Sequence, residues 1–118
     1  ESNVLVYNTT NSNIAVICED AISAMKIDLA GYAGVALCCS SLNGDDAFKL
    51  AMRFKTLLVW LDNDNAEVRK NAATITERLR LYTDRVFLNN FDTDPKHYYV
   101  DNIKETVVYM TSAEANKD

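Results

Sequence analysis

The sequence has few of the residues that mark several common kinds of binding site. Its 118 residues include three glycines, and neither a GxGxxG fingerprint nor a P-loop motif occurs, which argues against the dinucleotide and nucleotide sites that use those loops. There is one histidine, and no cysteine belongs to a CxxC pair, so a zinc site is not expected. Cys18, Cys38 and Cys39 lie in apolar runs, and we expect them to be buried free thiols in a reducing compartment.

Long apolar runs and an excess of positive charge are also missing. Apolar residues make up 48% of the chain, enough for a core, but no run approaches the roughly 20 residues that span a bilayer. The start of the chain does not resemble a signal peptide, so a cytoplasmic protein without a membrane partner is expected. The net charge is −5, whereas a domain that binds nucleic acid unaided is usually basic. Nucleic-acid binding would therefore depend on metal ions or on a basic neighbouring surface.

The length fits a single domain that covers residues 1–118, with a core at 14–100. Because the chain begins with Glu1 rather than Met, we expect a fragment or subunit of a larger protein.

Short apolar runs alternate with helical patterns along the chain. The runs at 14–18, 35–39, 56–61 and 85–88 are typical of strands buried on both faces, residues 3–7 favour an extra strand, and helices are predicted at 20–30, 45–54, 65–82 and 101–110. In the first helix, Ile22, Met25 and Leu29 form the stripe expected to face the core, and Gly31 and Gly34 are expected to end it. This alternation predicts an α/β fold with a sheet of about four mainly parallel strands, flanked by helices.

Acidic residues directly follow two of the predicted strands. Glu19 ends the first strand, and Asp62 and Asp64 follow the third as a DND triplet. Ligands of open parallel sheets bind outside the carboxyl ends of the strands, so these acids converge if the two strands are neighbours. Clustered carboxylates need a raised pKa or a cation, and hard oxygen ligands suit Mg²⁺ or Mn²⁺. We therefore expect Glu19, Asp62 and Asp64 to bind a divalent metal ion.

Two motifs resemble those of the Toprim domain, the catalytic module of bacterial and phage primases, type IA and type II topoisomerases, OLD-family nucleases and RecR-type repair proteins. They are the strand-terminal glutamate of IAVICEDAISAMKI and the DxD of LLVWLDNDNAEVRKNAA, and the match covers residues 14–100. The later segment FDTDPKHY resembles the Asp-Pro segment of primase-type Toprims. The resemblance implies a Rossmann-like Toprim fold. Asp20 departs from the glycine of many members, and we expect it to cap a helix rather than bind metal.

The resemblance also implies a mechanism. Asp62 and Asp64 would hold one or two Mg²⁺ (or Mn²⁺), and Glu19 would complete the site or take the proton from an attacking 3′-hydroxyl. For a primase, the reaction is nucleotidyl transfer from NTPs to a new RNA chain on a single-stranded DNA template, in DNA replication. Asp94 is a candidate additional acid. Lys96 is a candidate contact to nucleotide phosphate, or else a solvated loop lysine, and a helicase or zinc-binding domain is an expected partner.

Three alternatives remain open from the sequence. A Toprim nuclease would use the same metal site with water as its nucleophile. A response-regulator receiver domain also carries acids after its first and third strands, but Asp64 has no counterpart there, and the stretch from Asp62 to Lys96 has room for only about one helix and one strand. An inactive Toprim module that docks a partner is disfavoured because all three acids are present.

Overall fold

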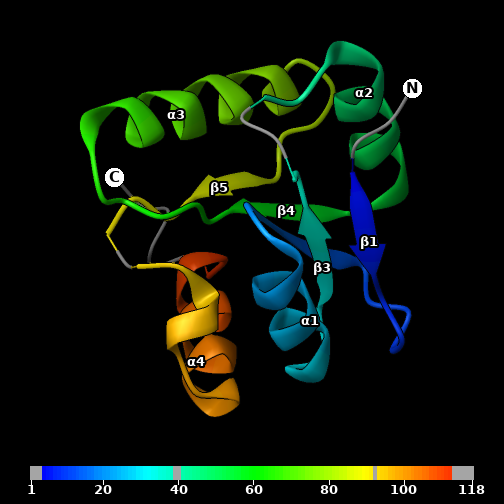
Figure 1. The fold of residues 1–118 in the computed structure, drawn as a ribbon. Helices are drawn as coiled ribbons and strands as arrows, with labels where there is room; N and C mark the ends of the chain where they lie inside the picture. The colour runs from blue at the N-terminus through cyan, green and yellow to red at the C-terminus, as the bar shows by residue number, and fades with distance from the viewer. Residues whose placement is uncertain (1–3, 39–40, 92, 113–118) are drawn as a thin grey trace.

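A five-stranded sheet with the strand order β1-β3-β2-β4-β5 forms the centre of the computed structural model, which describes residues 4–38, 41–91 and 93–112 (Figure 1). The strands are Leu5–Tyr7 (β1), Ile14–Cys18 (β2), Ala33–Ala36 (β3), Thr56–Val59 (β4) and Val86–Leu88 (β5). β1 is antiparallel to β3, and the other neighbouring pairs are parallel. The predicted α/β class with a mainly parallel sheet is therefore confirmed, and the segment at 3–7 supplies a fifth strand.

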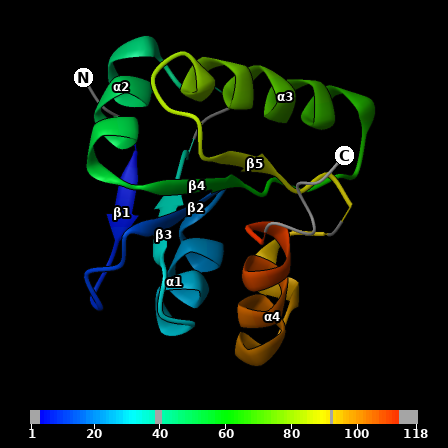
Figure 2. The ribbon, with the colours of Figure 1, turned by 180° about the vertical axis from the view of Figure 1, so that it is seen from behind.

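Helices cover both faces of this sheet. α1 (Ala21–Leu29) and α4 (Val100–Met110) lie on one face, while α2 (Gly44–Arg53) and α3 (Ala66–Arg80) lie on the other (Figures 1 and 2). The 3-10 turn η1 (Pro95–His97) precedes α4. Alternate residues of β2 pack on opposite faces of the sheet. Ala15 and Ile17 lie in the core under α2 and α3, and Val16 and Cys18 lie in the core under α1 and α4. Burial on both faces explains the continuous apolar runs.

The connections between the parallel strands leave the sheet on opposite faces. α1 links β2 to β3 on one face, and α2 then carries the chain across the other face to β4, on the far side of β2. The loops that leave β2 and β4 therefore diverge at the carboxyl ends of two neighbouring strands. This topological switch point is where open α/β sheets bind ligands. Among the described residues, no helix is both long and apolar enough to cross a membrane.

The buried face of α1 differs from the prediction. The three apolar residues expected to face the core are exposed by 61%, 45% and 73%: Ile22, Met25 and Leu29. Gly34 lies in β3 rather than at the helix end, and a Cβ atom there would come within 2.0 Å of the carbonyl oxygen of Ala24. Because the helix approaches the strand so closely at Ala24, only a small side chain fits at that point. The buried residues of α1 are Ser23, Ala24 and Ile27.

The cysteines only partly meet their prediction. Cys18 is fully buried at the end of β2, as expected. Cys38 is exposed, because β3 ends at Ala36 rather than at residue 39 and the chain turns away at Cys38 with a left-handed φ of 60°. The expected burial of Cys38 is therefore wrong, and Cys39 lies outside the described residues.

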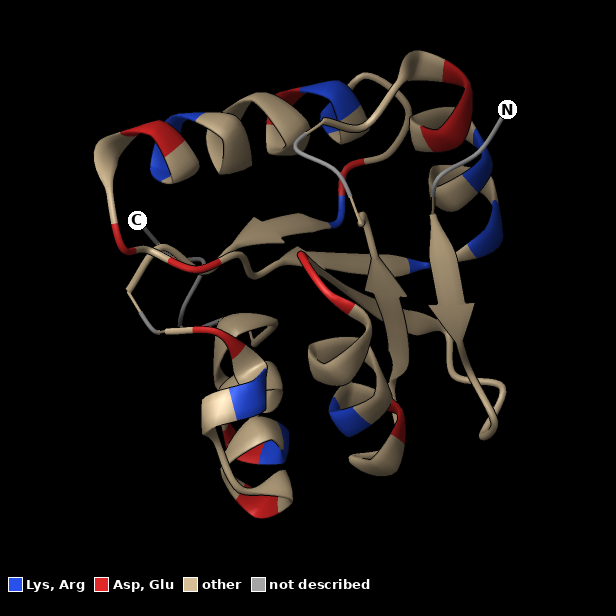
Figure 3. Cartoon of the chain, viewed as in Figure 1, with Lys and Arg blue, Asp and Glu red and all other residues tan. Residues whose placement is uncertain are grey.

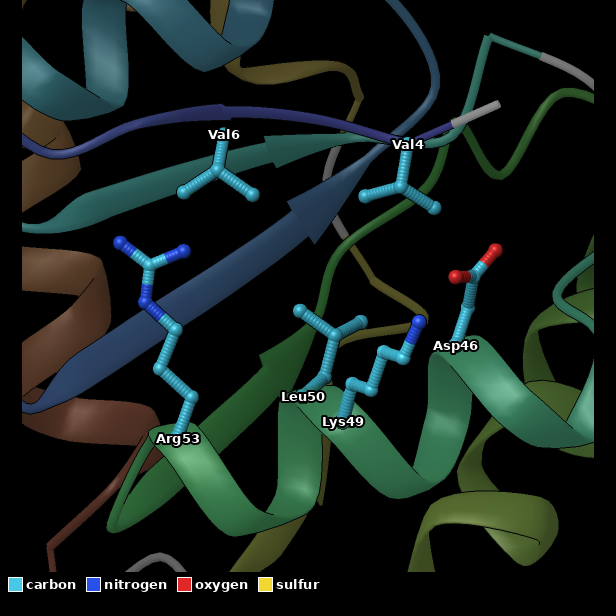
Figure 4. Close-up of a pocket in the computed structure, with 6 residues that line it drawn as sticks. All are labelled: Val4, Val6, Asp46, Lys49, Leu50 and Arg53. Atoms are coloured by element: carbon cyan, nitrogen blue, oxygen red, sulfur yellow. The ribbon is translucent and has the colours of Figure 1, made fainter. Parts of the chain in front are cut away.

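A groove of about 160 Å³ lies between β1 and α2 (Figure 4). Its lining is part apolar and part charged, from Val4, Val6, Asp46, Lys49, Leu50 and Arg53. β3 separates β1 from β2 in the sheet, and none of the predicted site acids contributes to the lining. The groove is thus distinct from the end of the sheet where the acids lie.

Candidate functional site

The predicted acids follow β2 and β4, which are neighbouring parallel strands. The backbone N–H of Trp60 donates to the carbonyl of Ile17 at 2.8 Å, so the two strands remain paired almost to the acids themselves. Acidic segments accordingly lie after β2 and β4 at one edge of the sheet (Figure 3). Glu19 and Asp62 are half-buried there, while Asp64 is exposed. Glu19 and Asp62 therefore follow neighbouring strand ends, and their charges interact.

A third acid, Asp94, reaches the same place from the loop after β5. The indole N–H of Trp60 donates to the carbonyl of Thr93 at 2.8 Å, and the ring of Tyr98 packs edge-on against Trp60 with 5.5 Å between centroids. These two contacts hold the loop against the sheet end, and Asp94 is only 3% exposed. The buried tryptophan of the third predicted strand thus brings Asp94 to the site.

The three carboxyl groups influence one another electrostatically. Burial raises the pKa of Glu19, and the charges of Asp94 and Asp62 raise it further, with an opposing contribution from Lys96. Burial also raises the pKa of Asp94, and the charge of Asp62 adds to this effect. Perturbed carboxyl groups at a strand-end cluster are typical of functional sites. The cluster of Glu19, Asp62 and Asp94 is called the acidic centre below.

Asp62 has a second set of neighbours. Burial raises its pKa, and a side-chain contact with Asp64 and the charge of that residue raise it further, while the charge of His97 acts in the opposite direction. Asp64 therefore contacts the acidic centre from its exposed side. The loop that carries both aspartates is tied to the loop after β5, because the Asn63 amide donates to the carbonyl of Phe91 at 2.8 Å.

Asp20 has the role that the sequence predicts for it. Its carboxylate accepts a hydrogen bond of 2.8 Å from the backbone N–H of Ser23 and thereby caps α1. Its other oxygen lies 2.9 Å from the ammonium of Lys96. Burial acts to raise the pKa of Asp20, but the hydrogen bond from Ser23 and the Lys96 charge outweigh it, so the pKa is lowered. Lys96, the candidate contact to nucleotide phosphate, is thus paired with a carboxylate.

Two oxygen atoms of the acidic centre are buried and have no hydrogen-bond partner among the residues that the structure describes: Oδ1 of Asp62 and Oδ1 of Asp94. Buried polar atoms are nearly always paired, and exceptions call for an explanation such as an ion. Hard carboxylate oxygens are the donors that Mg²⁺ and Mn²⁺ prefer, so the chemistry of the centre suits such an ion. As they stand, no three acidic, histidine or cysteine side chains in the described part of the chain are grouped closely enough to hold a metal.

Sequence reasoning assigned Asp94 a lower rank than the structure gives it. Its segment is polar and contains the only proline, which indicates an exposed loop. The signal that would have raised its rank is Trp60, an indole N–H donor within an otherwise apolar strand, because such a buried donor needs an acceptor from another segment.

Comparison with known proteins shows what the fold resembles. No family model matches the chain, and no curated protein matches it significantly in sequence. The crystal structure of Aquifex aeolicus primase, comprising its zinc-binding and RNA polymerase domains, matches over 84% of this chain with a TM-score of 0.65. The chain shares its fold with a primase.

The similarity to the primase is low in sequence and covers only part of the primase chain. The sequence identity to the primase is 20%, and the chain spans 25% of the primase chain's length. The similarity therefore establishes a primase-like fold, while membership of the Toprim family remains a prediction from the two motifs. The primase-like fold agrees with the α/β architecture and with acids at the switch point of the sheet.

Proposed function

We propose that this chain is a metal-dependent nucleotidyltransferase domain of the primase type, which synthesises RNA primers on single-stranded DNA during replication. The observation that carries the proposal is the pair of unpartnered, buried carboxylate oxygens of Asp62 and Asp94 beside Glu19, at the switch point of a primase-like sheet. Two such buried carboxylate oxygens, on neighbouring acids, have the chemistry that a divalent cation needs.

In this proposal the acidic centre has separate roles for its members. Asp62 and Asp94 would hold Mg²⁺ or Mn²⁺ through their unpartnered oxygens, with Asp64 contributing from the exposed side. The bound ion supplies neutralisation of the triphosphate charge and favours in-line attack. Glu19 would accept the proton of the 3′-hydroxyl, because burial and its acidic neighbours raise its pKa and bring its basicity closer to what proton abstraction needs.

The bond changes follow from these roles. The 3′-oxygen of the growing RNA forms a bond to the α-phosphorus of the incoming NTP, the bond from that phosphorus to the bridging oxygen breaks, and pyrophosphate leaves. Glu19 takes the hydroxyl proton. Lys96 has 35% of its side chain exposed, and an ammonium has three donors, so it would bind a phosphate oxygen while it keeps its carboxylate contacts.

The direct test measures metal binding and primer synthesis in the full chain. We expect Mn²⁺ to bind, and labelled NTPs to be incorporated on single-stranded DNA templates when Mg²⁺ or Mn²⁺ is present. The variants Glu19→Gln and Asp62→Asn should lose incorporation by at least about tenfold, because each removes a group that acts in the transition state. Asp45→Asn is the matched control, since that side chain is 75% exposed on α2 and pairs with Lys49.

Two results would overturn the proposal. Wild-type protein that binds no Mn²⁺, or binds it equally well after Asp62→Asn, would remove the metal site. Metal-dependent cleavage of labelled DNA without NTP incorporation would replace primer synthesis by the nuclease alternative, since both reactions use the same carboxylates.

A further inference from the structure

Lys96 contacts two carboxylates at the acidic end of the sheet. Its ammonium is 2.9 Å from Oδ2 of Asp20 and 3.5 Å from Oδ2 of Asp94. A lysine ammonium is positively charged at neutral pH. One cationic group therefore joins the cap of α1 to the most buried acid of the centre.

The position of this ammonium is fixed through its own backbone. The N–H of Lys96 donates to the hydroxyl of Ser23 at 3.3 Å, and the ammonium of Lys26 donates to the carbonyl of Lys96 at 3.2 Å. The Lys26 ammonium also donates to the carbonyl of Tyr98. Ser23 is only 1% exposed. The η1 turn is thus attached to α1 on both sides of Lys96, unlike a surface lysine on a free loop.

The two carboxylate oxygens of Asp94 have different surroundings. Oδ2 of Asp94 pairs with the ammonium, whereas Oδ1 is buried and has no partner in the described part of the chain. Oδ1 of Asp62 is likewise buried and unpartnered. Two-ion centres place their cations about 3.5–4 Å apart and need carboxylates shared between both. Here Oδ2 of Asp20 and Oδ2 of Asp94 both contact the Lys96 ammonium. Its positive charge would repel a second metal ion placed next to these two oxygens.

We propose that Lys96 is an internal cation of the acidic centre, and that Asp62 and Asp94 would therefore hold one divalent ion instead of two. The inference rests on the proposed metal-dependent function and decides between its one-ion and two-ion forms. Lys96 occupies the second cationic position with an amino-acid side chain. It is a positioning and charge-balancing residue for the metal ligands, in addition to any contact it makes with phosphate.

The experiment counts Mn²⁺ ions by titration of the full chain, with electron paramagnetic resonance as the readout and without nucleotide or DNA. Wild-type protein should bind one ion and show no spin coupling between manganese ions. Lys96→Met keeps the length of the side chain and removes its charge, so Oδ2 of both Asp20 and Asp94 becomes free and a second, spin-coupled ion should bind. Lys49→Met is the matched control, because that lysine pairs with Asp45 on α2, and it should leave the count at one.

Each outcome has a distinct meaning. Two spin-coupled ions in wild-type protein would overturn the inference without any variant, so it stays testable even where Lys96→Met does not fold. A single ion in a folded Lys96→Met variant, at unchanged affinity, would overturn it as well. No bound ion in wild-type protein, or binding that is unchanged in Asp62→Asn, would instead refute the proposed function itself. Lys96→Arg should keep one ion, which separates the effect of charge from that of side-chain shape.

Discussion

The Asp94 side chain is buried although its carboxylate is incompletely paired, and this combination lowers the stability of the fold. Asp94 is 3% exposed, and one of its carboxylate oxygens has no partner, so its ionised form is costly to bury. Burial and the charge of Asp62 raise its pKa for the same reason. A buried acid with an unpaired oxygen and a perturbed pKa is typical of a functional site.

Asp94→Asn should therefore stabilise the protein while weakening its site. We expect the free energy of unfolding at neutral pH, measured with urea in the absence of metal, to rise by about 1 kcal/mol because a buried ionised group becomes neutral. The affinity for Mn²⁺ should fall by about tenfold or more. Asp45→Asn, which changes an exposed acid, should alter neither quantity. Destabilisation by Asp94→Asn would show that its carboxylate is satisfied after all.

Trp60 has an equally specific role at this scale. Trp60→Phe should cost about 1–2 kcal/mol of unfolding free energy, because it removes the donor to the Thr93 carbonyl and leaves a smaller ring against Tyr98. Since this hydrogen bond holds the loop that carries Asp94, Mn²⁺ affinity should fall together with stability. Urea titrations of wild type and variant, each with and without Mn²⁺, measure the loss of unfolding free energy and the loss of Mn²⁺ affinity. Unchanged Mn²⁺ affinity would mean that the loop is held by its other contacts.

At the scale of elements, the contact between α1 and β3 determines how the first helix lies on the sheet. Gly34 admits the backbone of α1 at Ala24, and the cap at Asp20 fixes where the helix begins. The same helix carries Ser23 and Lys26, which bind the η1 turn. The packing of one helix thus positions both the acid after β2 and the segment that contains Lys96.

Gly34→Ala tests this contact. The added methyl would lie 2.0 Å from the Ala24 carbonyl oxygen, a distance that forces backbone movement, so we expect a loss of about 3 kcal/mol or more in unfolding free energy. Gly44→Ala is the matched control, because a Cβ atom there meets nothing within 4 Å, and it should be neutral or slightly stabilising. Thermal or urea denaturation of both variants is sufficient. Similar stabilities for the two variants would contradict the close helix–strand contact.

The same contact explains where the sequence was informative about elements and where it was not. Strand runs and helix caps depend on neighbouring residues, so the order of elements and the cap at Asp20 followed from the sequence. Which side of α1 is buried depends on Gly34, a residue of the next strand, and hydrophobicity alone pointed to Ile22 and Leu29 instead. In the same way, strand ends predicted the neighbouring positions of Glu19 and Asp62, whereas the burial of Asp94 depends on a distant tryptophan.

At the scale of the whole molecule, the acidic centre should shape the pH dependence of stability. The pKa values of Glu19, Asp62 and Asp94 are raised in the folded state, each mainly by burial. Between the ordinary carboxyl value of about 4 and these raised values, the folded state binds more protons than the unfolded state. The stability that this uptake provides is fully present below the unfolded pKa and is lost as the pH rises through the folded pKa. Asp20 has a lowered pKa and acts in the opposite sense at more acidic pH.

The expected result is a free energy of unfolding that decreases as pH rises from about 4 toward neutrality. In the double variant Asp62→Asn/Asp94→Asn this decrease should be much smaller, so the variant should gain stability over wild type as the pH increases. Added Mg²⁺ should stabilise wild-type protein most at neutral pH, where the carboxylates are ionised and free to bind it. Urea titrations between about pH 4 and neutrality measure the wild-type profile, the profile of the double variant and the effect of Mg²⁺. Parallel profiles for wild type and double variant would contradict the assignment.

The reactivity of the Cys18 thiol would measure how often the end of β2 opens to solvent. This thiol is fully buried directly before Glu19, lies within hydrogen-bonding distance of the Val35 carbonyl, and has a pKa raised by burial and by the nearby carboxylates. Alkylating reagents attack the exposed thiolate form, so Cys18 should react only in molecules in which the end of β2 has transiently separated from its neighbours, whereas exposed Cys38 marks the rate without such protection. The ratio of the two labelling rates reports how often the end of β2 opens, and an ion bound across its end would slow Cys18 alone.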